Sequence, residues 1–284
     1  MKGEFKIEPK WKKSSGEIWA DHFEKLTSGA TEQSREERGI VVKGGFSHFR
    51  SYALYYAAAA AIIILLITPM VYTRNISAQR GEHLAYTLPD GSEVTINAQS
   101  ELSYRPLLWY VSRGVKMEGE ILFKVKKGSD FTVKSSNGKV RVLGTTFNVI
   151  SRDSRYEVTC IEGRVEVSAK TGEAERKRVI ISGGEGVELM ENEGLMNLPA
   201  DEVVSSISWI RNNFYFTAVP LRVVLDEIAR QYNVEVTLGT EEEMVYTGNF
   251  SGSTSLEEVL EIVALPFSLK IEKRGKGYLL YREN

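Results

Sequence analysis

The chain has 284 residues, a formal net charge of −2 and a single cysteine, Cys160. This charge argues against a nucleic-acid-binding surface, because such surfaces carry a clear excess of Lys and Arg. A single cysteine excludes an intrachain disulfide, so each domain must be stable through packing alone.

Residues 52–72 contain no charged side chain, and tyrosines stand at both ends of their run of Ala, Ile and Leu. About 20 apolar residues suffice to cross a bilayer as a helix, and tyrosines favour its interfaces. We therefore predict a single transmembrane helix over residues 51–73. The alternatives are a buried helix, which is rarely so long and uncharged, and a cleaved signal peptide, which does not follow about 50 polar residues.

Basic residues are more frequent before this segment than after it. Arg35, Arg38, Lys43 and Arg50 precede it, whereas Arg74 and Arg80 follow it. Because positive charge favours the cytoplasmic side, we expect residues 1–50 to form a cytoplasmic tail and the rest to lie outside.

The tail contains one candidate helix. Ile18, Trp19, Phe23 and Leu26 follow helical spacing, which predicts a short amphipathic helix. Two interpretations of the tail aromatics stay open: Trp11, Trp19 and Phe23 pack on a partner protein, or they rest near the membrane in a disordered tail.

Residues 80–197 show the alternation of polar and apolar residues that is typical of strands. The predicted strands are 92–97, 115–125, 131–134, 139–143, 146–150, 156–161 and 164–168. Asn137-Gly138 predicts a type I′ turn with positive φ at Gly138. These features indicate an antiparallel all-β domain that ends near Asn197.

Residues 200–284 repeat a strand–helix–strand pattern twice, which predicts a small α+β domain. Strands are expected at 214–217, 234–238, 244–250, 268–272 and 278–281, with helical spacing over 221–232 and 256–263. Pro220 suits a first helical turn, and Ser255 with Glu258 suits a capping box. The whole chain is therefore predicted to be a multidomain membrane protein.

Catalytic constellations are not evident in the sequence. His22 and His48 precede the apolar segment and His83 follows it, so they cannot form one site. No zinc-ligand spacing, nucleophile elbow or phosphate-binding loop is present. Glu118 and Glu120 could be paired carboxylates on one strand face, but Gly119 and the basic flanks favour a solvated strand edge. We predict no catalytic residue, metal or cofactor.

Five segments resemble the FecR family of membrane-spanning anti-sigma regulators. They are residues 87–97 (TLPDGSEVTIN), 100–102, 119–120, 142–149 (VLGTTFNV) and 162–165. Toward the carboxy terminus, Phe216, Pro220-Leu221, 232–234, 250–252 and 256–260 resemble the secretin/TonB short N-terminal-type domain, which follows the β domain in Bacteroidetes-type members. The resemblance covers residues 80–284.

This resemblance implies a signal transducer rather than an enzyme. Such proteins span the inner membrane of Gram-negative bacteria once, with the amino terminus in the cytoplasm. They bind an extracytoplasmic-function sigma factor there, and their periplasmic domains sense the signalling domain of a TonB-dependent outer-membrane transporter. Two departures are the tail, which is shorter than in most members, and Cys160, which occupies a position that is usually aliphatic.

The resemblance and the residues together give three sets of candidate binding residues. The sigma factor is expected on Trp11, Trp19 and Phe23. The transporter is expected to add a strand to one of two edges, formed by Phe214, Tyr215, Phe216 and Thr217 or by Tyr278 to Tyr281. The alternative function is a membrane-anchored periplasmic module that binds glycan or peptidoglycan through Tyr104, Trp109 and Tyr110, in a loop with Arg105 and Pro106.

Overall fold

The computed structural model describes residues 14, 16, 17, 19, 20, 24, 46–169, 178–190 and 193–283. The chain forms two compact units, Met1–Ala58 and Ala59–Asn284. In the first unit residues 16, 17, 19, 20 and 24 are helical and Trp19 is exposed. The other residues of the expected tail helix, Ile18, Phe23 and Leu26, lie outside the described residues, as does Trp11.

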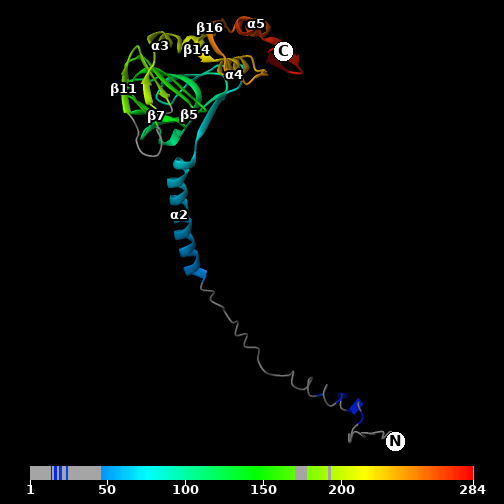
Figure 1. Ribbon diagram of the computed structural model, residues 1–284. Coiled ribbons are helices and arrows are strands. Elements are labelled where there is room, and N and C mark those ends of the chain that lie inside the picture. The colour runs from blue at the N-terminus through cyan, green and yellow to red at the C-terminus, as the bar shows by residue number, and fades with distance from the viewer. Residues whose placement is uncertain are drawn as a thin grey trace, which may run out of the picture. The chain divides into compact units, whose positions relative to one another are not determined.

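A single long helix, α2 (Phe46–Val71), contains the apolar segment (Figure 1). Its window Tyr52–Val71 has a mean hydropathy of 2.2, and none of that window is buried within the chain. Pro69 lies in the last turn, and the Thr68 hydroxyl donates to the Ile64 carbonyl at 2.7 Å. By length and composition this helix can cross a membrane.

Two sheets follow the helix, and they share one strand, β5 (Arg113–Lys124). The first sheet has the order β1-β4-β5-β6-β7-β10-β11, and the second has the order β2-β3-β5-β8-β9-β12-β13. The remaining strands are β1 (Arg74–Ala78), β2 (Leu84–Thr87), β3 (Glu93–Ile96), β4 (Ser100–Tyr104), β6 (Phe131–Lys134), β7 (Gly138–Val142), β8 (Thr146–Arg152), β9 (Arg155–Glu162), β10 (Arg164–Ala169), β11 (Arg178–Ser182), β12 (Glu185–Met190) and β13 (Gly194–Asn197).

Strand β5 changes sheets at Gly119. Residues 115–118 pair with β4, whereas residues 119–124 pair with β8. Gly119 has φ +99°, and a Cβ there would lie 2.3 Å from the Ser100 hydroxyl oxygen. Only glycine accepts this conformation and this close approach without strain, so Gly119 permits the strand to turn from one sheet into the other.

One hydrophobic core fills the space between the sheets. Phe131 from the first sheet and Phe147 from the second both contact Phe123, with ring centroids 6.2 and 5.1 Å apart. Cys160 is fully buried in this core, in agreement with a packing role. We refer to residues 74–197 as the β-rich part.

Three sequence expectations for this part need correction. The sheets are not wholly antiparallel, because β5 and β6 pair in parallel. The β6–β7 hairpin exists, but Gly138 does not have positive φ. Lys134 pairs with Lys139 across a four-residue loop, so the prediction of a two-residue type I′ turn is wrong. Strands β1, β2, β4, β11, β12 and β13 were not predicted, since most of them are short or lack clean alternation.

The C-terminal part (residues 213–281) contains the predicted strands and helices in order. Helices α4 (Leu221–Gln231) and α5 (Leu256–Ala264) pack on two small sheets, β14–β16 and β15-β18-β17. The strands are β14 (Asn213–Pro220), β15 (Glu235–Leu238), β16 (Val245–Ser251), β17 (Lys270–Arg274) and β18 (Gly277–Tyr281). Ser255 caps α5 by accepting from the Glu258 amide at 3.3 Å, as the sequence predicts.

The two strands expected to offer a free edge, β14 and β18, differ in whether an edge is unpaired. Strand β14 pairs only with β16, so it is an edge strand. Strand β18 lies between β15 and β17, with parallel and antiparallel pairing on its two sides. The prediction that a partner adds a strand at Tyr278–Tyr281 is therefore wrong, because both main-chain edges of β18 are already paired.

Gly138 is needed for space rather than for φ. A Cβ there would lie 2.5 Å from Tyr156 Cζ and 2.6 Å from the Ser168 carbonyl oxygen. We expect Gly138→Ala to lower the free energy of unfolding by about 1–3 kcal/mol, as overpacking does. Thermal unfolding of the full chain in detergent measures this. Gly114→Ala is the control, because its Cβ would have nothing nearer than 3.8 Å. Equal midpoints for the two variants would contradict the clash.

Candidate functional site

A buried polar network lies where the β-rich part meets the C-terminal part. Its centre is Gln231, the last residue of α4. The Gln231 amide nitrogen donates to Asn97 Oδ1 at 2.9 Å and to Glu227 Oε1 at 2.7 Å. Its amide oxygen lies 3.0 Å from Nε2 of His83. One side chain of α4 thus joins both parts of the chain.

The network continues into the β-rich part through Glu120. The Asn97 amide donates to Glu120 Oε2 at 2.8 Å, and the Asn148 amide donates to Glu120 Oε1 at 2.9 Å. Asn148 also donates to the carbonyl of Ser206 at 3.2 Å, in the segment that precedes β14. Both carboxylate oxygens of Glu120 are therefore held by amides that also contact the C-terminal segments.

Glu120 was expected on a solvated strand edge, and this expectation is wrong. Its exposed fraction is 7 %, whereas Glu118 is exposed. The two carboxylates lie on the same alternating face of β5, but the segments after β13 cover Glu120 and leave Glu118 in solvent. The apolar run Ile121-Leu122-Phe123 directly after Glu120 was the signal in the sequence that this end of β5 is buried.

Burial raises the pKa of Glu120 above its ordinary value of 4.5. The negative charge of Glu227 adds to this shift, while Arg152 and the two amide donors oppose it. Burial also tends to raise the pKa of Glu227, but the charges of Arg230 and Arg152 outweigh it and hold that pKa below 4.5. Arg230 donates to Glu227 Oε2 from Nε at 3.1 Å and from Nη2 at 2.8 Å.

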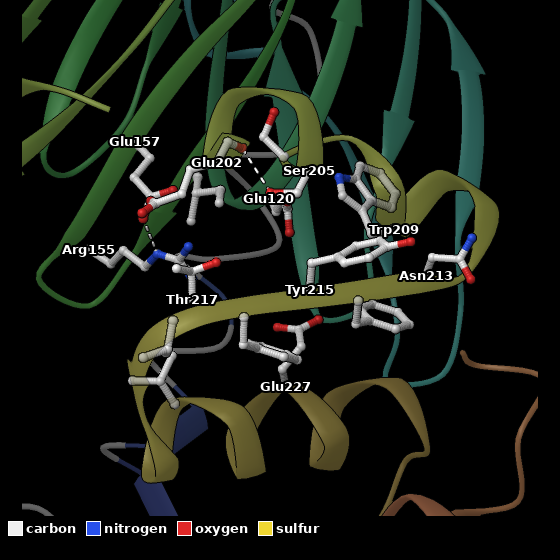
Figure 2. A pocket seen from close by; sticks show the side chains of 16 residues that line it. Glu120, Arg155, Glu157, Glu202, Ser205, Trp209, Asn213, Tyr215, Thr217 and Glu227 are labelled. Atoms are coloured by element: carbon white, nitrogen blue, oxygen red, sulfur yellow. Dashed lines mark hydrogen bonds and ion pairs between the residues drawn. The ribbon is translucent and has the colours of Figure 1, made fainter. Parts of the chain in front are cut away.

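A cavity of about 110 Å³ lies beside this network (Figure 2). Glu120, Glu227 and Trp209 line it, together with β14, and Arg155 pairs with Glu157 at one end. The Trp209 ring meets His83 edge to face at 5.3 Å between centroids, yet its indole nitrogen has no hydrogen-bond partner. The carboxylates of Glu120 and Glu227 make the cavity wall polar, and the Trp209 indole N–H is a hydrogen-bond donor without a partner.

The expected transporter-binding residues on β14 differ in exposure. Phe214 is buried and stacks on Phe250 at 5.1 Å, while Phe216 is half-buried at 5.6 Å from the same ring. Tyr215 and Thr217 are exposed, Tyr215 by 52 %. The structure thus brings Tyr215 and Thr217 to one accessible face and places the two phenylalanines in the core.

Tyr278, from the second candidate edge, is buried and donates to Glu257 Oε1 at 2.6 Å. Trp19 is 66 % exposed in the tail unit. Of the aromatic loop expected in a glycan-binding module, Tyr104 and Trp109 are buried in the core and Tyr110 is 90 % exposed. Two of those three rings thus anchor the loop and offer no face to a sugar.

Metal ligands do not gather in the residues that the structure describes: no group of three or more His, Cys, Asp or Glu side chains there is placed to hold an ion. The sequence did not indicate that five of these residues belong to one site: His83, Asn97, Asn148, Trp209 and Gln231. No local spacing connects these residues, since they come from separate loops, strands and helices.

The raised pKa of Glu120 predicts a specific pH dependence. Above pH 4.5 the unfolded chain releases this proton before the folded chain does, so the free energy of unfolding falls as pH rises toward the folded pKa. Its slope is at most about 1.4 kcal/mol per pH unit. Glu120→Gln removes this contribution, and its stability relative to the unaltered chain should increase with pH from 4.5 upward.

Denaturant unfolding of both chains at several pH values measures this difference. Glu118→Gln is the matched control, because it makes the same change at an exposed position two residues away on the same strand. A difference for Glu120→Gln that is constant or decreasing with pH would contradict the raised pKa.

Comparisons with known proteins agree with this architecture. The FecR protein family model matches residues 74–166, and the FecR C-terminal model matches residues 213–280. Two crystal structures of a candidate anti-sigma factor from Parabacteroides distasonis are similar, both at 28% sequence identity. Their TM-scores are 0.64 and 0.65, and the alignments cover 75% and 74% of this chain and 100% of those chains. Among curated proteins, none matches this chain.

The two matched segments are β1 to β10 and β14 to β18, which lie on either side of the buried network. The chain belongs to the FecR family.

Proposed function

We propose that this protein is an inner-membrane anti-sigma factor that relays the state of a TonB-dependent outer-membrane transporter to an extracytoplasmic-function sigma factor. The family and its anti-sigma structural relatives support the regulatory role. The observation that carries the relay is the buried network around Gln231 and Glu120, because it joins the C-terminal part to the β-rich part that continues from α2.

In this proposal α2 crosses the inner membrane once, residues 1–50 lie in the cytoplasm, and the two folded parts lie in the periplasm. The uncharged window of α2 and the excess of basic residues before it support this orientation. The role is one of binding and transmission, and it needs neither a cofactor nor nucleic acid.

Thiol labelling of intact cells tests the orientation. Ser14 and Ser253 are both exposed, whereas Ser92 is buried and unsuitable for labelling. A cysteine at Ser253 should react with a reagent confined to the periplasm, and one at Ser14 should react only after the membrane is opened. The unaltered chain is the control, because Cys160 is buried. Reaction at position 14 alone would overturn the orientation.

The periplasmic signal is proposed to enter at β14. This strand has one unpaired main-chain edge, to which an extended segment of the transporter's signalling domain can add, with exposed Tyr215 and Thr217 supplying side-chain contacts. We expect Tyr215→Ala to weaken binding of that signalling domain about tenfold or more, since aromatic side chains dominate such interfaces.

Titration calorimetry with the full chain in detergent measures this affinity. Tyr110→Ala is the matched control, because Tyr110 is an exposed tyrosine of the β-rich part. If Tyr110→Ala weakens binding and Tyr215→Ala does not, the signal enters through the β-rich part.

The tail is proposed to hold the sigma factor through Trp19 and Phe23, with Trp11 as a further contact. Trp19 is exposed and lies in the helical stretch, as an anchoring residue requires. Changing Trp19 and Phe23 together to Ala should release the sigma factor and raise transcription of its targets. Phe5→Ala controls for the loss of an aromatic residue elsewhere in the tail. Wild-type copurification of the sigma factor with the double variant would exclude this helix.

A further inference from the structure

The β-rich part begins almost directly where α2 ends. Helix α2 ends at Val71, and β1 begins at Arg74. Two residues lie between them, and the three Cα–Cα steps from Val71 to Arg74 span at most about 11 Å when fully extended. The headgroup layer outside the hydrocarbon core is roughly 5–8 Å thick on each side. If α2 crosses a bilayer, the start of β1 therefore lies at the membrane surface.

Strand β4 runs back toward the same point. It pairs with β1 in antiparallel register, so that its last residue, Tyr104, faces Arg74. The chain after Tyr104 continues in the direction from which β1 came. In agreement with this, Thr73 lines the same cleft as Tyr104, Arg105 and Leu108. The loop of residues 105–112 is thereby brought next to the membrane by covalent connection and register.

This loop presents apolar side chains to its surroundings. Leu107, Tyr110 and Val111 have exposed fractions of 55, 90 and 86 %. The loop is held firmly beneath them, because Trp109 is buried and meets Tyr104 edge to face at 5.2 Å. Aliphatic and tyrosine side chains together are typical of segments that lie in the bilayer interface.

The cleft beside the loop is basic. Its volume is about 550 Å³, and the charged side chains among its lining residues are Arg105, Lys116, Lys134 and Lys139. The three lysines lie in one row across β5, β6 and β7, at the level of Ser103 and Asn75. Glu101 on β4 and Glu118 on β5 stand opposite each other in the register, two residues farther from the membrane end.

We propose that this membrane-facing surface, formed by Leu107, Tyr110 and Val111 with Arg105, Lys116, Lys134 and Lys139, docks on the bilayer that α2 crosses. The three loop side chains enter the interface, and the basic cleft binds the phosphate groups of anionic phospholipids. The inference depends on α2 spanning the membrane, but not on which side the amino terminus occupies or on any sigma factor or transporter.

The test uses the full chain reconstituted into vesicles of phosphatidylcholine with or without phosphatidylglycerol. An environment-sensitive fluorophore is attached to Val111→Cys or, as the matched control, to Val204→Cys. Val204 is 77 % exposed in α3 (Ala200–Ser205), next to Val203, which packs beside Gly186. Through the sheet register Gly186 stands at the level of Leu122, far along β5 from the loop. Vesicle flotation first establishes that the chain is membrane-bound, which separates failure of α2 from failure of the docking surface.

The fluorophore at position 111 should emit at shorter wavelength and be quenched by nitroxide lipids roughly twofold more than the one at position 204, because it lies in the interface. Phosphatidylglycerol should increase this quenching, and Lys116→Glu with Lys134→Glu should abolish the increase. Equal spectra at positions 111 and 204 in floated vesicles would overturn the proposal. If quenching at position 111 is the same with and without phosphatidylglycerol and in the lysine variants, the cleft does not bind anionic phospholipids.

Discussion

Burial of the Glu120 carboxylate is the constraint on which the rest of the extramembrane structure depends. A buried carboxylate must be compensated by hydrogen bonds or opposite charge, because leaving it unpaired costs several kcal/mol. In this chain the compensation comes from the positive charge of Arg152 and from hydrogen bonds of Asn97 and Asn148, and both asparagines also contact the C-terminal segments. The packing of α4 and of the segment before β14 is therefore part of what makes the buried charge tolerable.

The burial of that carboxylate follows from the segments that pack over it. Glu118 and Glu120 share the outer face of β5, since side chains alternate with a period of two. At Gly119 the strand leaves one sheet and joins the other. From Glu120 onward its outer face is covered by the C-terminal segments, whereas Glu118 remains in solvent. Ser100 fills the space that a Cβ at Gly119 would need, and its hydroxyl oxygen accepts a hydrogen bond from the Glu120 backbone amide at 3.0 Å. Turn, burial and network thus form one local arrangement.

Much of the fold could be predicted from the sequence because it depends on residue patterns within single segments. The apolar run of α2, the alternation in β6 and β9, and the cap at Ser255 are signals within single segments. The parallel pairing of β5 with β6 and the central position of β18 were not predictable in this way, because which strands pair depends on how distant segments come together in the folded sheet. Gly138 shows the same limit: its importance was foreseen, but the reason lies in Tyr156 and Ser168, which are distant in sequence.

The site was harder to predict than the fold, since its members share no spacing. His83, Asn97, Asn148 and Gln231 are ordinary polar residues until the structure brings them around Glu120 and Glu227. The apolar run Ile121-Leu122-Phe123 directly after Glu120 was the one available signal. The flanking charges favoured the wrong interpretation, because the sequence does not reveal that the C-terminal segments cover β5 from Glu120 onward.

The network also limits how a signal can pass through this molecule. Pulling α4 away from the β-rich part would break the hydrogen bond of Gln231 to Asn97 and separate Glu227, which stays with Arg230 on α4, from the positive charge of Arg152. Breaking a buried, charged network typically costs about 3–5 kcal/mol, which a partner binding at β14 would have to supply from its own differential affinity. A partner that does not supply this free energy leaves the two parts joined. Its effect can then reach α2 only by moving both parts together, through β1 and the two residues that connect it to the helix.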